Sequence, residues 1–142
     1  MSKTLGRYIY DTLAAESDVY SKVGGNLNPR ISPYLRNAPT ASDFPAIVFD
    51  VGSTQVTTDS LAINRTCQTT ATVSILDRTY DNADAVAKAV IEALDANTST
   101  ADCITQIRIE SVEHSMETPY DGSQDLVYRV NLSFSIIHKA PI

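Results

Sequence analysis

The sequence predicts an α+β fold in which a four-stranded, mainly antiparallel sheet carries helices on one face, in the chain order α-β-β-α-β-β. Two observations support this prediction. Residues 66–75 and 128–136 alternate between apolar and polar side chains, which is the pattern of strands with one buried face. Between them, residues 83–94 repeat apolar side chains at the i, i+3, i+4, i+7 spacing of a helix with one buried stripe. The expected fold is therefore a helix laid across the apolar face of a sheet.

The N-terminal part of the chain predicts a helix over residues 2–15, with Ser2 as its N-cap. Apolar and aromatic residues recur there at helical spacing, so one side of this helix should pack on the sheet or on a neighbour. Residues 16–25 predict a short second helical turn. Gly24 and Gly25 end it, because glycine readily takes the left-handed conformation that stops a helix.

Residues 26–45 contain four prolines and predict a long extended loop rather than a helix or strand. A loop of this length in a compact domain usually binds something or becomes ordered on assembly. Residues 46–53 then alternate as a short strand. The polar residues 54–63 predict a projecting hairpin tip that leads into the strand at 66–75.

In the second half of the chain, either Asp81 or Asn82 is expected to cap the central helix. A third strand is predicted over residues 104–113, and the turn signals Pro119 and Asp121-Gly122 fold the last strand back beside it. One core should lie under the helix. Its expected members are Val73, Ile75, Val86, Val90, Ile91, Leu94, Ile107, Ile109, Val130, Leu132 and Phe134.

Composition limits the function classes. The 142 residues are expected to form a single domain, with the sheet-and-helix core over residues 46–138. The net charge of −6, without any basic run, disfavours sequence-independent binding to nucleic acid or to a membrane surface. No signal peptide or membrane span is evident, so a cytosol-like compartment is expected, where Cys67 and Cys103 are buried thiols rather than a disulfide.

Residues able to carry chemistry are sparse. His114 and His138 fall at predicted strand ends and are expected to be exposed edge residues. Asp77, Asp81 and Asp84 surround the start of the central helix, where acidic residues favour the helix dipole, so capping is preferred to metal binding. We therefore expect no catalytic, metal or cofactor residue, and an interaction or assembly protein rather than an enzyme.

The second face of the predicted sheet is polar without being strongly charged, so it can face water or meet another subunit. It carries Gln68, Thr70, Thr72, Ser74, Arg108, Glu110, Arg129, Asn131, Ser133 and Ser135.

A series of segments along the chain adds a more specific indication. A short N-terminal helix is followed by VGG at residues 23–25, by Pro29, and by FPAIVF at residues 44–49. The segment VSILDRTYDNAD at residues 73–84 then leads into a helix that ends at Ala93-Leu94. This series spans nearly the whole chain and resembles the tail-completion, or tail-terminator, proteins of tailed bacteriophages.

The resemblance implies a small α+β subunit that forms a ring, commonly a hexamer, at the head-proximal end of the tail tube. Such a ring stops tube growth and presents a surface to the head connector, and the family has no catalytic residues to carry over. It implies three partners: further copies of this chain, the tail-tube protein and the head-connector protein. The expected location is the head–tail junction of a virion assembled in the host cytoplasm. The acidic balance suits a channel through which DNA passes without specific binding.

The predicted projections supply the candidate interface residues, because long polar loops suit contacts with a neighbouring subunit or ring. The candidates are Asn28, Arg30, Tyr34 and Arg36 in the long loop, Gln55, Thr57, Asp59 and Leu61 in the hairpin tip, and Tyr120 and Asp121 in the last turn. Two alternatives stay open. One is a head-side connector or stopper ring, and the other is a non-viral ligand-binding or regulatory module that uses the polar sheet face.

Overall fold

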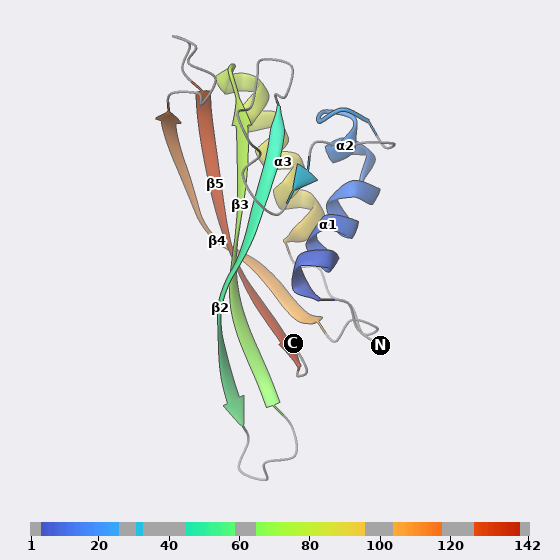
Figure 1. The fold of residues 1–142 in the computed structure, drawn as a ribbon, viewed down its shortest axis with the longest axis vertical. Helices are drawn as coiled ribbons and strands as arrows, with labels where there is room; N and C mark the ends of the chain where they lie inside the picture. The colour runs from blue at the N-terminus through green and yellow to red at the C-terminus, as the bar shows by residue number, and fades with distance from the viewer. Residues whose placement is uncertain are drawn as a thin grey trace.

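The structure, a computed structural model, describes residues 4–25, 31–32, 45–58, 65–95, 104–117 and 127–139. Its helices are α1 (Leu5–Ala15), α2 (Ser17–Tyr20) and α3 (Tyr80–Leu94). Its strands are β1 (Ile31–Ser32), β2 (Ala46–Thr58), β3 (Arg65–Asp77), β4 (Ile104–Glu117) and β5 (Val127–Lys139). Figure 1 shows a long, strongly twisted sheet with the helices on one of its faces.

The described strands form one five-stranded sheet in the order β1-β2-β3-β5-β4. Strand β2 pairs antiparallel with β3, β3 with β5, and β5 with β4, whereas β1 pairs parallel with β2. The α+β class is therefore confirmed, and the last strand does lie beside the third long strand of the prediction. The count of four strands and the order α-β-β-α-β-β were wrong.

The extra strand β1 lies inside the segment predicted to be a loop, residues 26–45. Its Ile31 is only 6% exposed and sits beside Ile47 of β2. Two residues are too few to produce an alternating pattern, and the surrounding prolines indicate irregular chain. Only the burial of Ile31 against the sheet gives this segment its strand geometry.

Strand β2 continues past the predicted end at residue 53, so residues 54–58, predicted to be part of a projecting hairpin tip, are paired strand. These residues pair with the start of β3, from Thr54 opposite Thr69 to Thr58 opposite Arg65. A register shift between Val51 and Thr54 lets β2 bend. At this shift a Cβ on Gly52 would lie 2.9 Å from the carbonyl oxygen of Thr70, so a side chain there would clash with backbone. The lower ends of β2 and β3 extend past the helices (Figure 1).

The helix ends follow local rules, at different residues from those predicted. Thr4 is the N-cap of α1, and its Oγ1 accepts a hydrogen bond from the backbone N–H of Arg7 at 3.2 Å. The predicted cap, Ser2, lies outside the described residues. Helix α3 begins two or three residues earlier than predicted, because its N-cap is Thr79 rather than Asp81 or Asn82, and Thr79 makes no side-chain cap bond. Asp81 lies in the first turn and favours the helix dipole.

The predicted stop after the second helical turn is confirmed. Gly24 and Gly25 have φ angles of 110° and 94°, in the left-handed region that favours glycine. The N–H of Gly25 donates to the carbonyl oxygen of Tyr20 at 2.8 Å, which satisfies one of the last acceptors of α2.

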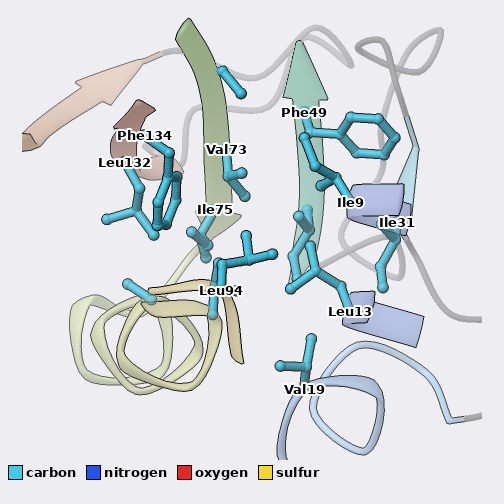
Figure 2. Packing of buried hydrophobic residues seen from close by; sticks show 14 of the residues in the cluster. Ile9, Leu13, Val19, Ile31, Phe49, Val73, Ile75, Leu94, Leu132 and Phe134 are labelled. Carbon is cyan, nitrogen blue, oxygen red and sulfur yellow. The ribbon is translucent and has the colours of Figure 1, made fainter. Parts of the chain in front are cut away.

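A single main core fills the space between the sheet and the helices (Figure 2). Nine of the eleven predicted core residues are buried there, and the other two, Ile91 and Ile109, pack against it partly buried. The core also includes side chains from α1, from α2 and the turn after it, and from β1 and β2 that the predicted core did not include: Leu5, Tyr8, Ile9, Leu13, Val19, Val23, Ile31, Ile47 and Phe49.

Replacing Leu132 by Ala should lower the free energy of unfolding by about 2–5 kcal/mol, because Leu132 has no exposed surface and its removal leaves a cavity. Urea unfolding followed by circular dichroism measures the change. The control is Thr70→Ala on the exposed side of β3, which should change the free energy by less than about 0.5 kcal/mol. Equal effects of the two substitutions would contradict the packing described above.

Candidate assembly surfaces

The sheet face opposite the helices is polar along much of its length. Gln68, Thr70, Arg108 and Glu110 are exposed on strands β3 and β4. The Nε2 of Gln68 donates to Ser135 Oγ of β5 at 2.9 Å, which links neighbouring strands across this face. The surface therefore offers hydroxyl and amide groups, with few charges, to water or to a partner.

Toward one end of this face the polar side chains are fixed by one another. Ser74 Oγ donates to Asn131 Oδ1 at 2.7 Å, and Arg129 Nε donates to the same oxygen at 3.0 Å. Ser74 itself is only 4% exposed. Beyond these residues lies a second small buried cluster of Val48, Leu76 and Val127. The alternation alone predicted a polar face that is open to water, but this end of the face is buried.

The outer side of β4 is a free sheet edge within the described part of the chain. Its Val112 is 45% exposed and its Met116 is 50% exposed. Val112 is opposite the core residue Leu132, and Met116 is opposite Tyr128, which packs against the core. Both exposed side chains therefore belong to the helix-bearing face.

Aromatic rings extend this apolar surface onto the start of α3. Tyr80 is 47% exposed, and its ring centroid lies 5.7 Å from that of His114 and 5.9 Å from that of Tyr128. The contact between Tyr80 and Tyr128 is edge-on, at an interplanar angle of 77°. We call Tyr80, Val112, His114, Met116 and Tyr128 together the β4 edge patch.

Toward the other end of the strand order, and on the same helix-bearing face, a cleft of about 520 Å³ lies between α1 and β2 and is lined by Gly6, Arg7, Tyr10 and Phe49. Arg7 forms an ion pair with Asp11 at 3.1 Å, and its guanidinium lies 5.8 Å from the centre of the Tyr10 ring. We call this feature the α1–β2 cleft. It combines an apolar floor with a cation held at its rim.

His138 was predicted to be an exposed edge residue, and that prediction was wrong. It lies on the interior strand β5, is 2% exposed, and its Nε2 is 2.9 Å from Thr69 Oγ1. Thr69 Oγ1 is in turn 2.7 Å from Thr54 Oγ1. Burial lowers the pKa of His138 below its ordinary value of about 6.5, because the charged imidazolium loses water. His114 is exposed on the edge strand, as predicted.

Two of the three aspartates around the start of α3, Asp77 and Asp84, have separate structural partners. Asp77 is 5% exposed and its Oδ1 accepts from the backbone N–H of Arg78 at 2.7 Å, whereas Asp84 pairs with Lys88 at 3.0 Å. Within the described ranges, no group of three or more His, Cys, Asp or Glu side chains is placed to hold a metal ion. None of the helices described here is both long and apolar enough to cross a membrane. Cys67 is a buried free thiol, and Cys103 lies outside the described residues.

Two of the ten predicted interface residues belong to described strand. Gln55 is exposed on β2, and Thr57 lies two residues further along the same strand. The other eight lie outside the described residues: Asn28, Arg30, Tyr34, Arg36, Asp59, Leu61, Tyr120 and Asp121.

The β4 edge patch and the α1–β2 cleft were both missed by the sequence prediction. One signal was present, because the apolar positions of β4 change from odd numbers at Ile107 and Ile109 to even numbers at Val112 and Met116. This phase change marks the bulge between Ile109 and Ser111. The cleft has no sequence signal, because it joins residues of α1 to a distant strand.

Comparison with known proteins decides the family. The model of the family described as tail completion protein gp17 matches residues 7–139. The chain belongs to this family. The match includes every strand and nearly all of α1, so the family resemblance inferred from the sequence is confirmed. Proteins of the tail completion family are structural components of the virion tail and are not typically enzymes.

A solved structure has the same fold as this tail completion family member. It is a chain of the virion of a native gene transfer agent (GTA) particle, with a TM-score of 0.66 over 93% of the present chain and 92% of the other. The two sequences are 15% identical, so the comparison concerns the fold alone. No curated protein matches the sequence.

The buried His138 should make the fold sensitive to mild acid. The pKa of His138 is lowered in the folded state, so below about pH 6.5 the unfolded chain binds the proton more readily than the folded chain. The free energy of unfolding therefore decreases as the pH is lowered. His138→Gln should remove part of this loss. Urea midpoints at about pH 7.5 and 5.5 measure it in His138→Gln and in the unmodified chain, which shows the full loss. An unchanged pH dependence in His138→Gln would disprove the assignment.

Proposed function

We propose that this chain forms a closed ring at the head-proximal end of a phage-type tail, where it ends tube growth and joins the tail to the head connector. The observation that carries the proposal is the match of the tail completion family model to residues 7–139. The fold shared with a chain of a gene transfer agent virion supports a role in a particle of this kind.

The surfaces of the subunit fit such a role. A ring subunit needs at least two different surfaces for its neighbours and further surfaces for the objects above and below the ring. The β4 edge and the α1–β2 cleft lie toward opposite ends of the strand order, both on the helix-bearing face, and the polar face and the long β2–β3 hairpin are separate from both. In this proposal the hairpin, including Gln55 and Thr57, and the long loop with Arg30 and Tyr34 reach neighbouring subunits or rings.

The proposed role is geometric and depends on no single reactive side chain. His138 is enclosed in the sheet beside Thr69, where it serves packing and hydrogen bonding rather than proton transfer to a substrate. The formal charge of −6 favours a channel wall that lets DNA slide, since like charges limit adhesion to phosphate.

The purified chain should assemble into a ring of about six subunits. Light scattering coupled to size-exclusion chromatography gives the mass, and negative-stain electron microscopy gives the shape. A monomer whose mass does not change with concentration would refute the ring, and would favour a ligand-binding module instead.

Deleting residues 57–60 should leave a folded subunit that fails to join tails to filled heads, because the deletion shortens the projecting hairpin without touching the core. Electron microscopy of lysates from phage carrying the deletion tests this. Cys67→Ala, at a buried thiol that belongs to none of these surfaces, is the control and should give normal particles. Normal virions from the deletion, with none from the control, would overturn the geometric role.

The same images distinguish a terminator from a head-side stopper. A subunit that ends tube growth, when removed completely, should leave tails longer than normal. A head-side stopper should leave tails of normal length beside unjoined heads. Tails of normal length after complete removal would therefore contradict the terminator role.

A further inference from the structure

A chain of three polar side chains joins the long β2–β3 hairpin to strand β5. Thr54 Oγ1 of β2 lies 2.7 Å from Thr69 Oγ1 of β3, and Thr69 Oγ1 lies 2.9 Å from Nε2 of His138 on β5. The function proposed above gives His138 no role beyond packing and hydrogen bonding. We call the strand ends that this chain joins the hairpin base, which consists of residues 54–58, 65–69 and 136–139.

The hairpin base lies where the buried part of the sheet ends. His138 is opposite Cys67 of β3, and Cys67 is opposite Val56 of β2, so these three side chains form one row on the same face. Cys67 and His138 are buried, whereas Val56 is 53% exposed. Water therefore reaches the outer member of this row, two strands away from the imidazole ring.

Two features separate the hairpin base from the centre of the sheet. In β2, the register shift between Val51 and Thr54 interrupts the regular pairing just where the base begins. The lower ends of β2 and β3 also extend past the helices (Figure 1). By contrast, Val73 and Ile75 of β3 lie in the main core. Segments with fewer buried contacts open at a lower free energy than the core, so the hairpin base is suited to open by itself.

The surroundings of His138 suit a neutral ring. Burial lowers the pKa of His138, and a hydrogen bond between its ring and the backbone of Lys139 opposes this effect only in part. The residues directly beside His138 on the two adjacent strands are Cys67 and Ile104. Within the described part of the chain, no carboxylate pairs with the ring to stabilise a positive charge. A proton on His138 therefore requires water to reach the ring.

A proton on His138 also reverses the direction of the hydrogen bonds. Neutral imidazole has one donor and one acceptor nitrogen, whereas the imidazolium ion has two donors. The bond to the backbone of Lys139 raises the pKa, so the ring is its donor, and Nε2 of the neutral ring accepts from Thr69. After proton uptake Nε2 has to donate, and the hydroxyl of Thr69 has to turn toward Thr54. The hydroxyl hydrogen of Thr54 then loses its acceptor in the chain and turns to water.

We propose that the chain of His138, Thr69 and Thr54 is a proton-sensitive latch that holds the hairpin base closed. Proton uptake by His138 releases the hairpin base, while the centre of the sheet stays paired. The latch belongs to the single subunit and does not depend on the proposed ring. A partner that binds the closed hairpin should oppose proton uptake by His138, because partner and proton favour opposite states.

Amide hydrogen exchange of the full-length chain at about pH 7.5 and 5.5 tests the latch, with each rate corrected for the intrinsic exchange rate. At both pH values the hairpin base should exchange faster than the sheet centre, residues 71–76 and 130–134, because it opens locally. The opened base binds a proton with the ordinary histidine pKa of about 6.5, so its opening equilibrium should rise about tenfold between these pH values. The protection of the hairpin base should therefore fall about tenfold.

Two substitutions assign the effect to the latch. His138→Gln removes the titrating ring, so the protection of the hairpin base should be the same at both pH values. Thr69→Val keeps the shape of the side chain but removes the hydroxyl between His138 and Thr54, so protection should fall about fivefold or more already at pH 7.5. Thr70→Val, at the exposed next position of β3, is the control and should match the unmodified chain. The unmodified chain decides the proposal even where circular dichroism shows that a variant is unfolded.

Three results would overturn the latch. A hairpin base that exchanges as slowly as the sheet centre would show that it opens only with the whole fold. Protection that is equal at the two pH values in the unmodified chain would show that opening leaves His138 buried. A full pH dependence in His138→Gln would assign the proton to another group. None of these results bears on the ring, which light scattering tests separately.

Discussion

The long antiparallel pairing of β3 with β5 is the constraint on which the rest of the structure depends. It runs without a register shift from Thr66 opposite Lys139 to Asp77 opposite Tyr128. Because side chains alternate between the two faces, this register puts Val73 beside Leu132 and Ala71 beside Phe134 on the same face. A slip of one residue would turn one strand's whole apolar set toward the polar face, so the core permits one register alone.

The outer strands depart from this regular centre, and their irregularities form the surfaces available for assembly. β2 has a register shift between Val51 and Thr54, and β4 has shifts near Ile104 and Ile109. Bulges increase twist and re-aim side chains. In β4 the shift at Ile109 is followed by apolar side chains on the helix-bearing face where α3 no longer covers them, which produces the exposed Val112 and Met116. The pairing of β3 with β5 is thus regular, whereas the outer strands β2 and β4 are irregular.

The polar groups of the interior serve the same geometric purpose. His138, Thr69 and Thr54 join strands β5, β3 and β2 by side-chain contacts within a mostly apolar face, at distances of 2.9 and 2.7 Å. Buried polar groups with partners specify one arrangement of neighbours, because a misaligned strand would leave them unsatisfied. In the proposed ring such rigidity would matter, since small errors in subunit shape would accumulate around it. These buried contacts therefore fix the positions of strands β2, β3 and β5, and with them the surfaces that the strands carry.

By itself, the sequence determined the α+β class, the central helix, the long strands and nearly all of the main core under α3. The reason is the length of three regular patterns. Residues 66–75 and 128–136 alternate for long enough to exclude a helix, and residues 83–94 repeat at helical spacing for long enough to exclude a strand. The family resemblance followed from segments spread along the same regions. Local chemistry also placed the stop at Gly24 and Gly25.

Only the tertiary structure decided the fifth strand, the burial of His138, and the positions of the β4 edge patch and the α1–β2 cleft. Ile31 becomes a strand residue because Ile47 lies beside it, and His138 is buried because β5 is placed between β3 and β4. The cleft joins Gly6 of α1 to Phe49 of β2. The physical reason is common to all three: periodicity reports which face of an element is apolar, whereas burial and exposure depend on which distant element covers that face.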